Sequence, residues 1–384
     1  MNSPTTTFKK DEVIVLLGAG ASVDAGIPHS AEMVRQIEKL IENEWNQFKD
    51  LYNYVRSAIF YADGIRGTFD GNVSYNIERL VVALDELSRR EEHPLYPFIG
   101  AWNPRLSQVA GIDFRNVAEF KTKILEKLRT QWIEIDNYDK ADYFQGLVRF
   151  QKQLNFPLHV FTLNYDLCVE KAFSAVHNKW PERGFGSDRF WSHGLLDEAT
   201  SESPSMYLYK LHGSIDWIRD KEGGKLTYSD STSKIPANEG ELIFGTTYKL
   251  QYVDPFLFLV YQLRRLSLEA KLIVVVGYGF GDEHINGILK QALRGDPNKR
   301  IVVASYFGEK IDDELTRSMN KHRDAIRLQL GLADGSASLV VVPHRARDFL
   351  GAYLTLEEME KHFPIEDSLF DVIATSAEPS ASTD

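Results

Sequence analysis

The chain has only one cysteine, Cys168, in 384 residues, and this scarcity limits the structures that it can form. An intrachain disulfide needs two cysteines, and a zinc site built from two C-x-x-C pairs needs four, so both are excluded. Leu167 and Val169 on either side are apolar, which predicts a buried structural thiol rather than a reactive one. His29 and His284 lack the clustered ligands that zinc requires, and we expect no metal.

The chain also lacks long apolar runs and an excess of positive charge. Only five apolar residues follow the charged residues near its start, too few for the core of a signal peptide, and no stretch reaches membrane-spanning length. Its 44 lysines and arginines face 55 aspartates and glutamates, for a net charge of −11, which disfavours nonspecific binding of DNA. We therefore expect a cytoplasmic protein with no membrane attachment and no direct nucleic-acid binding.

The most informative segment is a short apolar run that leads into glycines. Val13 to Leu17 has no polar alternation, as expected of a strand buried on both faces, and Gly18-Ala19-Gly20-Ala21-Ser22 follows it. Glycines at the carboxyl end of such a strand let backbone N–H groups approach a phosphate, and Gly26-Ile27-Pro28 extends the loop. The alternative is a tight turn that binds nothing, and the loop alone does not decide between the two.

The dinucleotide fingerprint G-x-G-x-x-G is only partly present in this loop. Gly18 and Gly20 fit it, but Val23 stands where the third glycine belongs. Residues Ala31 to Glu44 look helical where a second strand with an acidic residue would be expected. An ordinary dehydrogenase is therefore disfavoured.

Apolar periodicity predicts an α/β fold, with a Rossmann-like parallel sheet flanked by helices and no zinc module. Ser30 can cap a first helix, and residues 45–153 have a mainly helical pattern, as in a large inserted helical subdomain. Two short apolar segments around Gly223-Gly224 predict a hairpin in a second insertion at 214–252. The single domain spans 1–375, and 376–384 is expected to be a disordered tail. Further strands are expected at 158–163, 207–211, 272–276, 301–304 and 339–342, and further helices at 171–176, 253–268 and 283–293.

Three polar clusters follow predicted strands, at the edge of the sheet where open α/β folds bind ligands. They are Thr162-Leu163-Asn164-Tyr165-Asp166, His212-Gly213-Ser214 and Gly277-Tyr278-Gly279-Phe280-Gly281-Asp282. Each has an ordinary structural explanation: a turn or helix cap at Asn164 and Asp166, a hydrogen-bonded core histidine at His212, and loop glycines after Gly277. Their shared position at strand ends indicates one ligand site.

In this order, the segments GAGAS…GIP, TLNYD, LHGS and VVGYGFGD resemble the sirtuin family, over Val13 to about Val342. The resemblance implies a Rossmann-like domain that binds NAD+ as its substrate and cuts the bond between nicotinamide and ribose. It implies catalytic roles for His212 as proton acceptor and for Asn164 and Asp166 near the nicotinamide ribose. The cofactor-binding residues that it implies are Gly18, Ala19, Gly20, Ser22, Gly26, Ile27, Pro28, Thr162, Asn164, Asp166, Gly277 and Tyr278.

The chemistry of these residue types agrees with those roles. Cleavage of the glycosidic bond develops positive charge on the ribose, so the reaction needs an oriented substrate and a group that takes a proton. The unperturbed pKa of histidine lies near neutrality, which suits His212 to that task. The Asn164 amide is suited to orienting a ribose hydroxyl or a water molecule by hydrogen bonds.

Two departures from the family bear on the reaction. Deacylating sirtuins carry a four-cysteine zinc module after the catalytic histidine, and residues 214–252 contain no cysteine, so their peptide-binding scaffold is not expected. After Pro28 the deacylases have an acidic residue, an aromatic residue and an arginine, whereas this chain has His29, Ser30 and Ala31. Without an acyl-lysine to act as the nucleophile, water is expected to attack the ribose. The products would be nicotinamide and ADP-ribose or its cyclised form.

The zinc-less pattern with a helical insertion resembles bacterial sirtuin-like NAD+ hydrolases (NADases) of antiphage defence, which deplete NAD+ in abortive infection. This resemblance implies a partner, a HerA-type DNA-translocating ATPase, and assembly into homo-oligomers. Trp45, Phe48, Tyr52 and Tyr54 offer an oligomer interface, although burial in a helical core is the simpler interpretation of each. The alternatives are a non-catalytic NAD+ or ADP-ribose binding module that serves as a scaffold or sensor, and an NAD-dependent protein deacylase.

Overall fold

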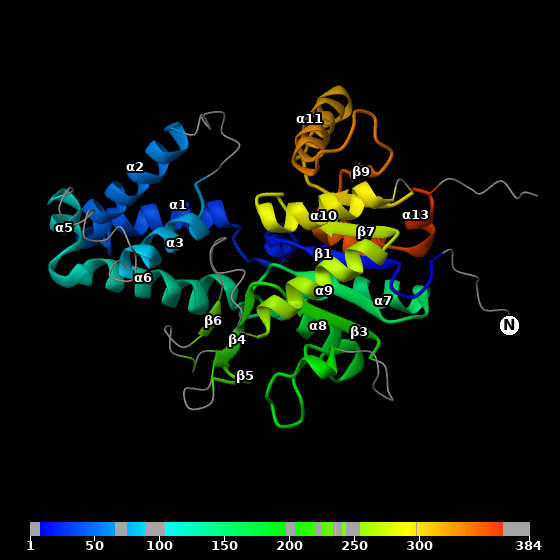
Figure 1. Cartoon of the computed structure of the whole chain (residues 1–384), viewed down its shortest axis with the longest axis horizontal. Helices are drawn as coiled ribbons and strands as arrows, with labels where there is room; N and C mark the ends of the chain where they lie inside the picture. Colours follow the sequence, from blue (N-terminus) through cyan, green and yellow to red (C-terminus); the bar gives the residue numbers. More distant parts are fainter. Residues whose placement is uncertain are drawn as a thin grey trace, which may run out of the picture.

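The centre of the molecule is a six-stranded sheet covered by helices on both faces (Figure 1). The coordinates are a computed structural model, which describes residues 8–65, 75–89, 104–196, 204–219, 224–232, 235, 240–242, 254–296 and 298–363. The strands of this sheet are β1 (Val13–Leu17), β2 (Leu158–Thr162), β3 (Met206–Lys210), β7 (Leu272–Val276), β8 (Arg300–Ala304) and β9 (Leu339–Val342).

The strands run in the order β3-β2-β1-β7-β8-β9, and every neighbouring pair is parallel. This is the order of a doubly wound sheet, which reverses between β1 and β7. All residues of these two central strands are buried, because helices cover both faces. The predicted Rossmann-like parallel sheet flanked by helices is confirmed. Open sheets of this kind bind ligands beyond the carboxyl ends of the strands, at the reversal.

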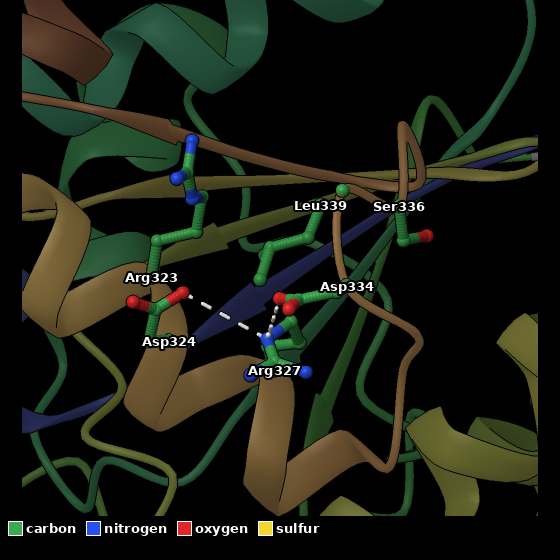
Figure 2. A pocket seen from close by; sticks show the side chains of 7 residues that line it. Arg323, Asp324, Arg327, Asp334, Ser336 and Leu339 are labelled. Carbon is green, nitrogen blue, oxygen red and sulfur yellow. Dashed lines mark ion pairs between the residues drawn. The ribbon is translucent and has the colours of Figure 1, made fainter.

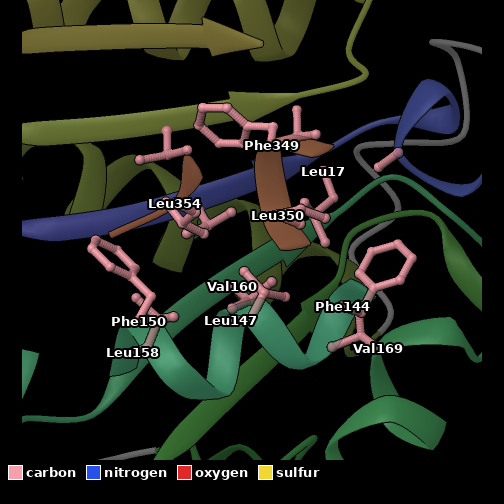
Figure 3. Close-up of a cluster of buried hydrophobic side chains, with 14 of the residues drawn as sticks. Leu17, Phe144, Leu147, Phe150, Leu158, Val160, Val169, Phe349, Leu350 and Leu354 are labelled. Carbon is pink, nitrogen blue, oxygen red and sulfur yellow. The ribbon is translucent and has the colours of Figure 1, made fainter. Parts of the chain in front are cut away.

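Side chains of each strand alternate between the two faces, and each face has its own apolar cluster. Figure 3 shows part of the cluster on the face that includes Leu17, Val160 and Phe349. The helices that cover this face are α7 (Gln145–Leu154), α8 (Cys168–His177), α12 (Ala346–Asp348) with its continuation η9 (Phe349–Tyr353), and α13 (Leu356–Glu360). The opposite face is covered by α9 (Phe256–Glu269), α10 (Glu283–Gly295) and α11 (Asp312–Leu330).

A separate group of helices, here called the helical lobe, lies beyond the carboxyl end of β1 (Figure 1). Its members share an apolar cluster of their own, in which Trp45, Phe48 and Tyr52 are buried. The interpretation of these aromatics as helical core is therefore confirmed, and Tyr54 is partly buried beside them. The lobe comprises α1 (Ser30–Glu42), η2 (Asn46–Phe48), α2 (Lys49–Ile65), α3 (Ile77–Ser88), α5 (Pro104–Ala110), η4 (Ile112–Phe114), α6 (Arg115–Lys127) and the π-helical turn η5 (Leu128–Ile133).

A small antiparallel sheet follows β3 in the chain. It contains β4 (Gly213–Arg219), β5 (Leu226–Tyr228) and β6 (Gly240–Leu242), in the order β5-β4-β6. Trp217 pairs with Tyr228, so the predicted hairpin forms. The predicted tail 376–384 and part of the predicted insertion 214–252 lie outside the described residues.

Two local predictions differ from the structure. Ser30 is the first residue of α1 rather than its cap, because the ring nitrogen Nδ1 of His29 accepts the Glu32 N–H at 3.3 Å. The helix predicted at 171–176 begins earlier, at Cys168, where the Asp166 carboxylate accepts the first free N–H. Among the helices that the structure describes, none has the length and apolar character that crossing a membrane requires.

Candidate functional site

The candidate site begins where β1 and β7 end side by side. The loops after the two strands interlock, since Gly18 N–H donates to Val276 O at 2.9 Å and Gly20 N–H donates to Gly277 O at 2.8 Å. A side chain at Gly18 would lie 2.6 Å from Tyr278 Cα, so this close approach of two backbones requires glycine. These two N–H groups hold the loops together and are not available to a phosphate, contrary to the expectation for a glycine cradle.

The rest of the glycine loop forms a short 3-10 helix, η1 (Ala19–Ala25), that leads towards α1. It ends at Gly26, whose φ of +100° lies in the left-handed region that favours glycine. Ala19 is exposed, Pro28 is partly buried and Ile27 is buried.

Asn164 joins the loop after β2 to the glycine loop. Its side-chain amide Nδ2 donates to Gly18 O and to Ser22 Oγ, each at 3.0 Å. Its own backbone N–H donates to Thr162 Oγ1, also at 3.0 Å, which fixes the turn after the strand. The other amide atom, Oδ1, is buried without a hydrogen-bond partner among the described residues. Asn164 therefore offers one buried acceptor at the carboxyl end of the sheet.

Asp166 has a structural task in the same turn. Its buried carboxylate accepts the Cys168 N–H at 3.0 Å and so starts α8. Burial first, and then the Asp166 charge, raise the pKa of the Cys168 thiol well above its ordinary value. The prediction of a buried, structural thiol is confirmed.

Lys210, the last residue of β3, donates hydrogen bonds to this turn. Sequence analysis did not single it out. Its buried ammonium donates to the backbone oxygens of Tyr165 and Asp166 and to Glu170 Oε1, the last at 3.0 Å. Arg183 Nη1 approaches the same Glu170 oxygen at 3.2 Å. The available signal was a single lysine inside the otherwise apolar strand segment YLYKL.

Replacing Lys210 with methionine is expected to lower the free energy of unfolding by about 3 kcal/mol or more, because Glu170 and two carbonyl oxygens lose a buried partner. Lys271→Met is the matched control, since Lys271 pairs with Glu12 at 3.0 Å from a half-exposed position. The control is expected to lose less than about 1 kcal/mol. Urea unfolding of the two variants measures both values, and equal losses would contradict the role given to Lys210.

His212 lies two residues beyond Lys210 and is buried, with 4% of its surface exposed. Its Nε2 is 3.4 Å from Asp282 Oδ2, and neither ring nitrogen completes a hydrogen bond with the described residues. The other carboxylate oxygen of Asp282 accepts the His284 N–H at 3.0 Å and caps α10. One oxygen of this carboxylate thus caps α10, and the other lies beside the imidazole.

Tyr278 anchors the loop that carries Asp282. Its hydroxyl accepts the Asp282 N–H at 3.2 Å and donates to Asn286 Oδ1 at 2.9 Å. Burial, and then the charge of Asp282, raise the pKa of Tyr278 well above its ordinary value, so the phenol stays neutral.

Tyr165 connects the two catalytic candidates, since it follows Asn164 and its ring lies 6.4 Å from that of His212, measured between centroids. Burial raises the pKa of Tyr165, and the carboxylates of Glu78 and Asp282 add to the shift. Glu78 belongs to α3, so the helical lobe contributes negative charge near the site, which sequence analysis missed because nothing in the local pattern distinguishes it.

The residues of the site fit a polar ligand. Asn164 Oδ1 and both ring nitrogens of His212 are buried polar atoms without hydrogen-bond partners in the described part of the chain, and all three follow strands at the carboxyl edge of the sheet. Gly279 and Gly281 have open space where a side chain would stand, so no packing in the described structure requires glycine there. Glycines at these two positions of the loop that carries Asp282 suit the close approach of a ligand.

A pocket elsewhere in the described structure does not resemble this site. A small pocket of about 130 Å³ lies at the start of β9 (Figure 2). Because the strands are parallel, this is the end of the sheet opposite to the strand ends that precede Asn164 and His212. Its Arg327 is paired with Asp324 and Asp334, at 3.7 and 3.4 Å. Among the residues described, no group of three or more His, Cys, Asp or Glu side chains is placed to hold a metal ion.

One protein-family model matches part of the chain. A SIR2-like domain matches residues 158–326, which contain Asn164, His212 and Gly277 but not the glycine loop. No curated protein matches the chain in sequence.

Solved structures that resemble the chain include a Sir2 enzyme and a Sir2 homologue in complex with NAD. The first is 13% identical, with 92% of this chain and 93% of that chain covered and a TM-score of 0.38. The second is 15% identical, with 91% and 89% covered and a TM-score of 0.38. The ADP-ribose complex of a mutant Sir2 homologue is 15% identical, with 91% and 92% covered and a TM-score of 0.39. From the strand order and the matched domain, we conclude that this chain has a sirtuin-like Rossmann fold, with a SIR2-like domain at residues 158–326.

Proposed function

We propose that this protein is an NAD+ hydrolase that releases nicotinamide and leaves ADP-ribose. The observation that carries the proposal is the set of buried, unpartnered atoms, Asn164 Oδ1 and the two ring nitrogens of His212, at the carboxyl end of a doubly wound sheet. An amide acceptor and an imidazole are the groups that orienting a hydroxyl and accepting a proton require.

The residues act in the following roles. Asn164 Oδ1 accepts a hydrogen bond from a ribose hydroxyl or from the attacking water, while its Nδ2 stays bound to Gly18 O and Ser22 Oγ. His212 takes the proton that water loses as its oxygen bonds to the ribose and the bond to nicotinamide breaks. The Asp282 carboxylate, 3.4 Å from Nε2, stabilises the protonated ring. Asp166 keeps the turn in place through α8.

The test is nicotinamide release from NAD+ by the purified protein, measured by chromatography. Asn164→Ala is expected to lower the rate about 100-fold or more, because a positioned group is lost, while the protein remains folded by circular dichroism. Thr130→Ala is a matched surface control that removes one exposed side-chain hydrogen bond and is expected to keep the wild-type rate.

The outcomes separate the alternatives. Tight NAD+ binding without turnover in any assembly state would contradict the hydrolase and support a binding module. Turnover that appears only with an acylated peptide would instead support a deacylase.

We also propose that this activity depletes NAD+ in abortive infection during antiphage defence, under the control of a HerA-type ATPase and within a homo-oligomer. The support for this role is the resemblance of the zinc-less motif set, together with the need to restrain an enzyme that consumes NAD+. Nicotinamide release by the protein alone and with the purified ATPase tests the control. A rate that the ATPase does not change, and no complex between the two on gel filtration, would contradict it.

A further inference from the structure

Arg129 is a buried cation without a partner. It lies in the π-helical turn η5, which continues α6, and only 5% of its surface is exposed. Its Nε, Nη1 and Nη2 are all buried without a hydrogen-bond partner, and no carboxylate in the described residues pairs with it. Burial alone lowers the pKa of this guanidinium, which nevertheless stays charged in proteins. The chain therefore buries a positive charge that nothing described here neutralises.

The other buried lysines and arginines that the structure describes have ion-pair or hydrogen-bond partners. Arg183 lies 3.2 Å from Glu170 and 3.0 Å from Asp216, and Lys210 shares Glu170. Lys299 donates to the carbonyl oxygens at the end of α9. An uncompensated buried charge is strongly destabilising, so a fold that keeps one at Arg129 indicates a ligand that completes it.

The turn that carries Arg129 belongs to the same apolar cluster as two residues that are close in sequence to the candidate site. Leu128, Trp132 and Ile133 of this turn share an apolar cluster with Leu167 and Ile215. Leu167 directly follows Asp166, and Ile215 lies three residues after His212. Turns of the π type are frequent at functional sites.

A second contact ties the same turn to the helix that follows the glycine loop. Trp132 Nε1 donates to Gln36 Oε1 of α1 at 2.6 Å. Arg129 is thus on a segment that is bonded to α1 and shares an apolar cluster with Leu167 and Ile215.

We propose that the Arg129 guanidinium binds a phosphate group. Its planar set of five N–H donors matches two phosphate oxygens at once, and all of its nitrogens are unused. Its atoms are buried, which suits a small anion rather than the surface of a macromolecule. The source is either the diphosphate of the dinucleotide, which rests on the proposed function, or a free phosphate.

The test is thermal unfolding and calorimetric binding with sodium phosphate, sodium pyrophosphate and ADP-ribose, each against sodium chloride of equal ionic strength. Arg129→Met without any anion is expected to unfold a few degrees above the wild type, because an unpaired buried charge is removed. The affinity of Arg129→Met for the anion is expected to fall about 10- to 100-fold, because a charge-assisted hydrogen-bonded pair is lost.

Arg79→Met is the matched control, because Arg79 also belongs to the helical lobe but is paired with Asp63 through two contacts of 2.7 and 2.6 Å. It is expected to unfold at a lower temperature than the wild type and to bind the anion as the wild type does.

Binding of phosphate, pyrophosphate and ADP-ribose distinguishes the two sources of the phosphate group. It also separates the phosphate site from the proposed hydrolase. Loss of ADP-ribose binding in Arg129→Met places the dinucleotide's diphosphate at Arg129. Phosphate or pyrophosphate binding that requires Arg129, without ADP-ribose binding, supports a free-anion site and counts against the hydrolase. If Arg129→Met binds every anion as the wild type does, the phosphate site is overturned, whether or not NAD+ is hydrolysed.

Discussion

Alanine at His212 is expected to reduce the rate of nicotinamide release by about 10²- to 10⁴-fold, the usual contribution of a general base. The imidazole is buried, and its ring nitrogens complete no hydrogen bond with the described residues, so no structural bond depends on it. The variant should remain folded, and its loss should appear in kcat rather than in NAD+ affinity. A chromatographic rate assay together with calorimetric binding separates the two quantities.

Asp282→Asn is also expected to lower kcat, because it changes the carboxylate that lies beside His212. Asparagine caps helices as well as aspartate does, so α10 should keep its start while the negative charge 3.4 Å from Nε2 is lost. We expect a fall in kcat of about 100-fold or more, with unfolding free energy changed by less than about 1 kcal/mol. Glu283→Gln, which removes an exposed charge from the next residue, is the control. Wild-type kcat in Asp282→Asn would contradict a role for the pair.

Alanine at Gly277 is expected to lower the free energy of unfolding by about 3 kcal/mol or more. The residue has a φ of +68°, which L side chains rarely adopt, and an added Cβ would lie 2.0 Å from the Ala21 backbone nitrogen. The β1 and β7 loops would have to separate, and the bond from Gly20 N–H to Gly277 O would break. Urea unfolding measures the loss, and NAD+ binding should be lost as well.

Gly279→Ala provides the contrast two residues away. The space around Gly279 is open, so its unfolding free energy should change by less than about 0.5 kcal/mol. If the ligand approaches this loop closely, NAD+ affinity should still fall about tenfold, a loss of about 1.4 kcal/mol. A Gly277→Ala protein as stable as Gly279→Ala would contradict the interlocking of the two loops, and unchanged NAD+ affinity in Gly279→Ala would contradict ligand contact at this position.

Much of the fold follows from local sequence patterns. The apolar segments at 13–17 and 272–276 were predicted as buried strands, and both form the centre of the sheet. The predicted helix start was wrong where a single side chain determines it, because the His29 ring rather than Ser30 caps α1. The polar clusters after the strands were located correctly, because parallel strands place all their carboxyl ends at one edge.

The contacts within the site were less accessible from the sequence. The glycine loop was expected to let backbone N–H groups approach a phosphate, and the N–H groups of Gly18 and Gly20 bind the loop after β7 instead. Lys210 and Asp282 gained their roles only from partners on other elements, Glu170 and His212. The sequence does not indicate that Arg129 is buried without a partner among the described residues, because an arginine on an amphipathic helix is ordinarily exposed.

The sequence by itself determined the class of fold, the glycine-rich and polar strand ends and the exclusion of intrachain disulfides, because apolar periodicity and residue chemistry are local properties. Only the tertiary structure decided which of these ends meet. The strand order brings β1 beside β7, so residues more than 250 positions apart interlock at Gly18 and Gly277. It also sets His212 against Asp282 and leaves Arg129 buried without a charge partner among the described residues. These pairings depend on how the chain crosses over between strands, and no local preference encodes that order.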